Sequence, residues 1–295
     1  MSSRRLSTTW SCRLISSADW PVRPSVPKRG RQVANDSIGR TFGVALGVCL
    51  VCSVLVSGAA VSLRPTQAIN KALDKKRNIL MAAGLMKAGE TVSGERIEEL
   101  YKNIEPRVVD LATGDYEGNL DAVAFDQRRA AKDLAQSMAI PAGEDFGGIK
   151  RRAKLASAYL VSDRGKVRKV ILPVHGKGLW STLYGFIALD AKDINTIRGL
   201  VYYEHAETPG LGGEVDNPDW KALWDGKMVF DESGSVRIEV IKGKVVPGRA
   251  ETKYQVDGLS GATITSRGVK DMLRYWLGEG GYGKYLAKLK QQGVS

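Results

Sequence analysis

Residues 41–63, TFGVALGVCLVCSVLVSGAAVSL, are 23 consecutive residues without a charged side chain. As an α-helix rising about 1.5 Å per residue, this stretch would extend over roughly 34 Å, which is enough to cross the hydrocarbon core of a bilayer. A cleaved secretory signal would have a shorter apolar region after a shorter basic segment. Although Ala59-Ala60 also fits a cleavage site, the pattern favours an uncleaved transmembrane helix.

The basic character of the chain is concentrated before this helix. The net charge is +12, and residues 1–40 hold eight Lys and Arg against two Asp, which accounts for half of the excess. This segment is rich in Ser, Arg and Pro and is predicted to be a disordered tail. The rest of the chain is only mildly basic and lacks a basic stripe interleaved with aromatic residues, so nucleic acid is not an expected partner.

The charges beside the helix leave its orientation open. Within about 20 residues of the span, equal numbers of basic side chains lie on the two sides. They are Arg23, Lys28, Arg29, Arg31 and Arg40 before the span, and Arg64, Lys71, Lys75, Lys76 and Arg77 after it. The arginines nearer the N-terminus favour a cytoplasmic tail over residues 1–40 and an exported domain over residues 64–295.

The exported part is predicted to have an α+β fold, as one mixed α/β domain on a single transmembrane helix. Residues 67–86 read as an amphipathic helix that ends near Gly84 or Gly89, and Ser93 is the expected N-cap of a second helix. Further helices are expected at 126–138, 218–224, 266–277 and 282–291. Strands are expected at 158–162, 167–174, 182–189 and 196–203, with hairpins at 163–166 and between 236–241 and 244–246.

Residues 257–266, DGLSGATITS, place four hydroxyl-bearing side chains and two glycines just before an apolar-periodic helix. Free backbone N–H groups and the positive end of the helix dipole would meet there, which suits a phosphate. The alternative is a loop that merely caps a helix beginning near Ser266. The string Asp-x-x-Ser-Gly-Ala-Thr resembles the flavinylation motif, which implies FMN bound to Thr263 through a phosphoester. The matching motif positions are Asp257, Ser260, Gly261 and Ala262.

A second segment, residues 204–213, follows a predicted strand. Pro209-Gly210 favours a type II turn, and Gly212-Gly213 would let the backbone approach a flat ligand closely. An ordinary turn between strands explains the Pro and Gly equally well. The segment is similar to the Thr-Pro-Gly-Leu-Gly turn of FMN-binding domains, which implies cofactor contacts for Glu207, Thr208, Gly210, Leu211 and Gly212.

A third segment, residues 175–182, contains Lys177, Trp180 and Ser181. Trp180 could stack on an isoalloxazine ring, and Lys177 could stabilise a reduced, anionic flavin. The alternative is a buried core Trp at the start of a strand. Gly176 and Gly178 do not make a dinucleotide fingerprint, because the third glycine and the following helix are missing. The two histidines lack partners at metal-ligand spacing, so neither a metal site nor a catalytic residue is expected.

Together these segments resemble the NqrC family, whose members are flavin-bearing subunits of Na+-translocating NADH:quinone reductases. The resemblance implies one membrane helix in the bacterial inner membrane, a periplasmic domain, and FMN attached to Thr263 by a flavin transferase that uses FAD. Electrons derived from NADH would pass through this FMN towards ubiquinone, coupled to Na+ export, in contact with other subunits. Such a subunit has no complete active site of its own. Residues 1–36 extend beyond the resemblance.

Three alternatives remain open at this point. The flavinylated subunit of an Rnf-type ferredoxin:NAD complex shares the motif at Thr263 and the turn at Thr208. A membrane-anchored FMN-binding sensor or assembly module would need the same residues. An exported domain that binds phosphate or polysaccharide without flavin would need neither Trp180 nor the turn. Because the span holds no carboxylate, the chain itself is not expected to conduct the ion.

Overall fold

The computed structural model describes residues 38–87 and 89–294, so the predicted disorder of residues 1–37 lies outside it. The apolar span and the amphipathic segment after it form one continuous helix, α1 (Ile38–Ala82), with Pro65 inside it. This is the one described helix that is long and apolar enough to cross a membrane, and the apolar side chains of its spanning part are exposed. The chain divides after Ser62 into two compact units.

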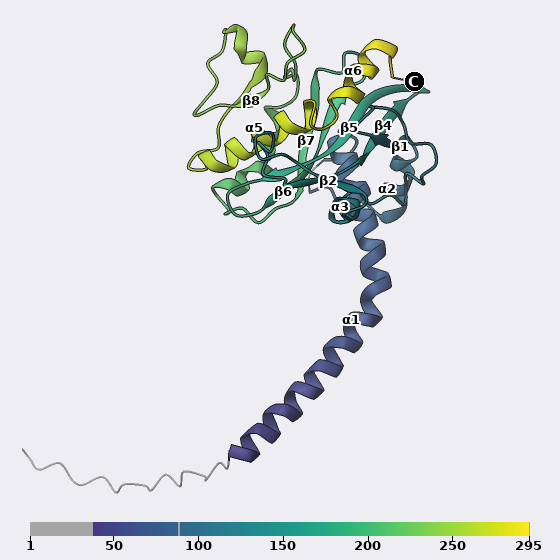
Figure 1. Cartoon of the computed structure of the whole chain (residues 1–295), viewed down its shortest axis with the longest axis vertical. Helices are drawn as coiled ribbons and strands as arrows, with labels where there is room; N and C mark the ends of the chain where they lie inside the picture. The colour runs from purple at the N-terminus through teal and green to yellow at the C-terminus, as the bar shows by residue number, and fades with distance from the viewer. Residues whose placement is uncertain (1–37, 88, 295) are drawn as a thin grey trace, which may run out of the picture. The chain divides into compact units, whose positions relative to one another are not determined.

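The second unit is built on a five-stranded antiparallel sheet in the order β1-β4-β5-β6-β7 (Figure 1). Its strands are β1 (Ile104–Asp110), β4 (Leu155–Asp163), β5 (Lys166–Lys177), β6 (Thr182–Asp190) and β7 (Ile197–Glu204). The predicted hairpin between β4 and β5 is confirmed. Arg164 and Gly165 both have positive φ, at 52° and 75°, as a two-residue turn between twisted strands requires.

Helices cover both faces of the sheet. On one face, α5 (Thr263–Leu277) and α6 (Gly283–Gln292) pack on alternate strand residues such as Leu172. On the other face, Ile171 contacts the cluster formed by the end of α1 and by α2 (Gly94–Tyr101). The alternation of β-strand side chains explains how neighbouring residues reach opposite cores. The sheet is therefore buried on both sides, which makes it a rigid support for the loops at its ends.

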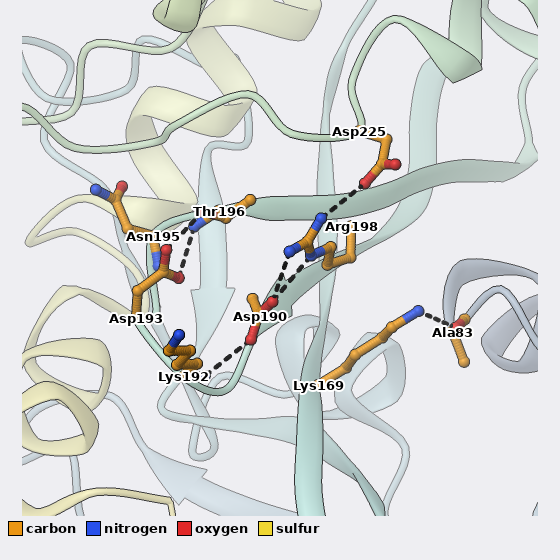
Figure 2. A network of polar contacts seen from close by, with 9 residues as sticks. All are labelled: Ala83, Lys169, Asp190, Lys192, Asp193, Asn195, Thr196, Arg198 and Asp225. Atoms are coloured by element: carbon orange, nitrogen blue, oxygen red, sulfur yellow. Dashed lines mark hydrogen bonds and ion pairs between the residues drawn. The ribbon is translucent and has the colours of Figure 1, made fainter.

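The end of α1 is fixed to this sheet. Lys169 on β5 donates a hydrogen bond from Nζ to the carbonyl of Ala83, 2.5 Å away, and Gly84 follows with φ of 70° (Figure 2). A cation at the last carbonyls of a helix satisfies acceptors that the helix leaves free. Nearby, Arg198 binds Asp190 at 2.8 Å and lies 3.5 Å from Asp225. The expected end near Gly84 is confirmed.

The remaining elements are short and include two corrections. The predicted helix 126–138 is limited to α3 (Gln127–Lys132), because Ser137–Ala139 forms β2 and pairs with β3 (Arg151–Ala153). The predicted hairpin 236–246 is also wrong, since β8 (Glu239–Val240) pairs in parallel with β9 (Gln255–Val256). Val240 and Val256 both lie in the core, so burial favours this distant pairing over the local turn. The others are η1 (Gly212–Asp216), α4 (Pro218–Ala222) and η2 (Ala250–Tyr254).

Candidate functional site

Helix α5 begins at Thr263, three residues earlier than predicted. The expectation of a helix that begins near Ser266 fails because Ser266 is buried within the first turn. Its N–H donates to the carbonyl of Ala262 at 2.9 Å, and its Oγ accepts the N–H of Leu259 at 3.0 Å. Thr263 is exposed at the helix start, and the N-cap Ala262 provides no side-chain acceptor. The first-turn N–H groups are thus available to an anion.

The carboxylate of Glu207 lies at the centre of the site, and the residue is only 5% exposed. Its Oε1 accepts the backbone N–H groups of Trp180 and Ser181, both at 3.0 Å, and the Ser181 hydroxyl at 3.2 Å. Its Oε2 accepts the N–H of Leu179 at 3.1 Å and the hydroxyl of Thr265 at 2.6 Å. One side chain therefore joins the three segments that the sequence singled out.

The charge on Glu207 is stabilised by these contacts. Burial alone would raise the pKa of the carboxyl, but the hydrogen bonds from Thr265, Ser181, Trp180 and Leu179 outweigh burial and hold the pKa below its usual value. Glu207 is consequently a carboxylate at neutral pH, in a position where it can only accept hydrogen bonds.

Two glycines make room for this carboxylate. A Cβ on Gly178 would lie 2.6 Å from Oε1 of Glu207, and a Cβ on Gly212 would lie 2.8 Å from Oε2 and 2.6 Å from Oγ1 of Thr265. Sequence reasoning assigned Gly212 to the close approach of a flat ligand. In the structure, protein atoms fill the space beside it. These glycines therefore serve the contacts between the segments.

The turn at Thr208 has the expected form. The N–H of Leu211 donates to the carbonyl of Thr208 at 3.1 Å, and Gly210 has φ of 75°, as a type II turn requires at that position. Leu211 then reaches the Thr263 segment, because its Cδ2 lies 2.8 Å from the place a Cβ on Gly261 would occupy. Gly261 itself has φ of 69°, so both reasons favour glycine there.

The loop at Lys177 is closed on itself and carries an exposed indole. Lys177 donates from Nζ to the carbonyl of Trp180 at 3.2 Å, and the N–H of Gly178 donates to the carbonyl of Ser181 at 2.8 Å. Trp180 is 67% exposed, so the alternative of a buried core Trp is wrong. The side chain of Lys177 is directed to its own loop in this arrangement.

Asp257 and Ser260 lie differently from the rest of the motif. Asp257 accepts the N–H of Val245 on Oδ1 at 2.8 Å, and its carbonyl accepts the indole N–H of Trp220 at 2.8 Å. These contacts fix the entry to the motif on the neighbouring loop and on α4. Ser260 is exposed in the turn before Thr263.

Apolar side chains are exposed on the same three segments. They are Leu179, Trp180, Leu211 and Ile264. An uncapped helix start beside exposed apolar and aromatic side chains fits FMN, whose phosphate needs N–H donors and whose ring system needs an apolar surface. Sequence reasoning did not assign a role to Thr265, although its place two residues after Thr263 puts it in the same helical turn.

Other features lie apart from this site. A cavity of about 710 Å³ lies between the C-terminal half of α5, α6 and residues 230–236, and none of the predicted site residues lines it. His205 contacts Asp216 at 2.7 Å, and burial lowers the pKa of His175 to about 4. Within residues 38–87 and 89–294, no group of three His, Cys, Asp or Glu side chains is placed to hold a metal ion.

Comparisons with known proteins agree with this geometry. Residues 178–278 match the FMN-binding domain family. The NqrC subunit of the Na+-translocating NADH-quinone reductase of Pseudomonas aeruginosa is 52% identical over 257 residues, covering 87% of this chain and 97% of that protein. The same subunit from Vibrio vulnificus is 48% identical over 264 residues, covering 89% of this chain and 99% of that protein.

Solved structures give the same result. The crystal structure of NqrC from Shewanella oneidensis superposes with a TM-score of 0.68 at 36% identity, covering 76% of this chain and all of that one. The crystal structure of the same reductase subunit from Parabacteroides distasonis gives a TM-score of 0.57 at 33% identity, covering 76% and 96%.

Proposed function

The chain belongs to the NqrC family, the members of which are subunits of the Na+-translocating NADH-quinone reductase, an oxidoreductase complex, and on this premise we propose that it carries FMN covalently on Thr263 and relays electrons within that complex. The observation that carries the proposal is the position of Thr263. It is an exposed hydroxyl at the first residue of a helix without a side-chain cap, within the part of the chain that matches the FMN-binding domain family.

Attachment to Thr263 is a phosphoryl transfer from FAD by a separate flavin transferase. The Oγ of Thr263 forms a bond to the phosphorus of the FMN half, the bond between the two phosphates of FAD breaks, and AMP leaves. The hydroxyl proton goes to solvent, and no electrons are transferred. Gly261 and Ala262 leave the hydroxyl open to the transferase, because neither carries a side chain beyond Cβ.

The chain would then hold the cofactor through groups of two kinds. The first-turn N–H groups of α5 would hold the phosphate and stabilise its charge. Leu179, Trp180, Leu211 and Ile264 offer exposed apolar surface to the ring system. Bound FMN supplies reversible uptake and release of electrons, which is the chemistry of a relay between NADH-derived carriers and ubiquinone. Because a covalent bond keeps the local concentration high, the ring can remain partly open to a neighbouring subunit.

The proposed setting is the bacterial inner membrane, with residues 41–63 as a single span, residues 1–40 in the cytoplasm and residues 64–295 in the periplasm. The membrane-spanning capacity of α1 supports the span, and the N-terminal arginines support the orientation. A periplasmic Thr263 would be out of reach of cytoplasmic NADH, so its electrons must come through other subunits. In spheroplasts, an added protease should digest the domain, whereas in inverted vesicles the domain should be protected.

Intact mass tests the attachment directly. The full chain, produced in cells that contain a flavin transferase, should be heavier than the polypeptide by one FMN less one water. Digestion should place that increment on the peptide that contains Thr263. A full chain with the mass of the bare polypeptide would refute covalent attachment.

A further inference from the structure

We propose that Glu207 is a positioning residue whose carboxylate fixes Trp180 relative to the helix turn that bears Thr263. This inference rests on the proposed attachment of FMN to Thr263. It gives Glu207 a role different from direct contact with the cofactor.

Glu207 has little hydrogen-bonding capacity left for a ligand. A carboxylate has about four lone-pair positions. Five donors already point at them, at 2.6 to 3.2 Å, and all belong to the protein. The residue is buried, and the backbone at Gly178 and Gly212 packs closely against its carboxylate oxygens.

Trp180 depends on its backbone for its position. Its side chain is mostly exposed, so packing does not fix it. Its peptide groups, however, are held on both sides. The N–H donates to Oε1 of Glu207 at 3.0 Å, and the carbonyl accepts from Nζ of Lys177 at 3.2 Å. Because the indole can turn only about its own side-chain bonds, the anchored backbone limits the region that it can reach.

The carboxylate of Glu207 also reaches α5. Oε2 accepts the hydroxyl of Thr265, which is in the first turn with Thr263. The path from the Trp180 backbone to this turn therefore consists of two hydrogen bonds through one buried charged group. Hydrogen bonds to an ionised acceptor are roughly twice as strong as neutral ones, so the link holds its geometry. A ring attached at Thr263 would therefore meet the indole within a restricted region.

Flavin emission provides a direct test, because an indole in contact with an isoalloxazine quenches its fluorescence. The full chain with covalent FMN is compared in its folded and denatured forms in detergent. We expect Glu207→Ala to raise the folded-to-denatured emission ratio severalfold, as Trp180→Leu does. The double variant should show no greater rise than Trp180→Leu alone, because both changes remove the same contact. The matched control is Glu232→Ala, which removes an exposed carboxylate and should leave the ratio unchanged.

Two results would overturn the inference. One is a folded-to-denatured emission ratio in Glu207→Ala equal to that of the wild type, together with a raised ratio in Trp180→Leu. The other is a rise of this ratio in the double variant that equals the sum of the two single rises, which would mean that Glu207 acts independently of the indole. If Glu207→Ala does not fold, Glu207→Gln replaces it. The Gln retains an oxygen for the N–H groups of Trp180 and Ser181, but its amide must face another donor, so a smaller rise is expected.

Hydrogen exchange separates this inference from the proposed function. If the wild-type chain lacks the mass of FMN, the attachment proposal fails and the emission test does not apply. The amides of Leu179, Trp180 and Ser181 should still exchange at least tenfold faster in Glu207→Ala, while amides within α6 should not change. Exchange rates at these three amides that are the same in Glu207→Ala as in the wild type would overturn the positioning role.

Discussion

Thr265 donates a hydrogen bond of 2.6 Å from Oγ1 to Oε2 of Glu207, and both residues are buried although 58 positions separate them in the sequence. Replacing Thr265 by Val keeps the shape and removes the donor, so Oε2 loses its shortest hydrogen bond. We expect Thr265→Val to lower the free energy of unfolding by about 2 kcal/mol, as measured by denaturant titration. Thr265→Ser keeps the hydroxyl, so its free energy of unfolding should fall by less than that of Thr265→Val. A loss in Thr265→Ser as large as that in Thr265→Val would show that the methyl group contributes as much to stability as the hydroxyl.

Thr263→Ala should abolish covalent flavin and leave the domain folded. The side chain is exposed, so its loss should change the free energy of unfolding by less than about 0.5 kcal/mol. The measurement is in-gel flavin fluorescence under denaturing conditions, with circular dichroism as the check on folding. Thr113→Ala, an exposed Thr outside the site, should keep the fluorescent band. A fluorescent band in Thr263→Ala would exclude Thr263 as the attachment point.

Gly212→Ala should destabilise the site through crowding. The added methyl would press on Thr265 and on Glu207, at 2.6 and 2.8 Å, and overpacking of this kind costs about 1–3 kcal/mol. Gly226→Ala is an informative control, because its position is open and only its φ of 80° opposes a side chain. Thermal unfolding measures the stability of both variants. Beyond the loss of stability, Gly212→Ala should also speed hydrogen exchange at Leu179–Ser181, and Gly226→Ala should leave that exchange unchanged.

The contribution of Glu207 to stability should depend on pH. Because its pKa is lower in the folded chain than the ordinary value of 4.5, the ionised form stabilises the fold above that value. This stabilisation is lost as the pH falls through the folded pKa. The difference in unfolding free energy between wild type and Glu207→Gln should therefore be largest near neutral pH and should narrow below about pH 4. Comparison with the Gln variant cancels the other carboxylates that titrate in this range. A difference that stays constant with pH would mean that the charge contributes nothing.

Sequence reasoning succeeded where the signal was local. The β4–β5 hairpin was predictable because alternating apolar residues flank a short turn that contains Gly165. The compact spacing of the motif around Thr263 led to the resemblance to the NqrC family, which the comparisons show. The start of α5 was placed too late, since Ser266 is a favoured N-cap residue. Its hydroxyl instead accepts an N–H from Leu259.

The failures concern contacts between distant segments. No local pattern around Val240 predicts its parallel pairing with Val256, because the partner strand lies beyond a long loop. The same holds for Glu207, whose residue type and place beside a glycine-rich turn suggested a ligand contact. Its five donors come from two other segments, and only the folded arrangement brings them together.

The arrangement around Glu207 also has a consequence for the order of events in biogenesis. Its donors begin at Leu179 and end at Thr265, and contacts of such long sequence separation form only when both ends are present. A chain synthesised only as far as the β4–β5 hairpin can complete that hairpin but not this site, since Thr265 lies in α5, well beyond the hairpin in the sequence. Thr263 and the loop that carries Trp180 are therefore brought together only after synthesis has passed Thr265.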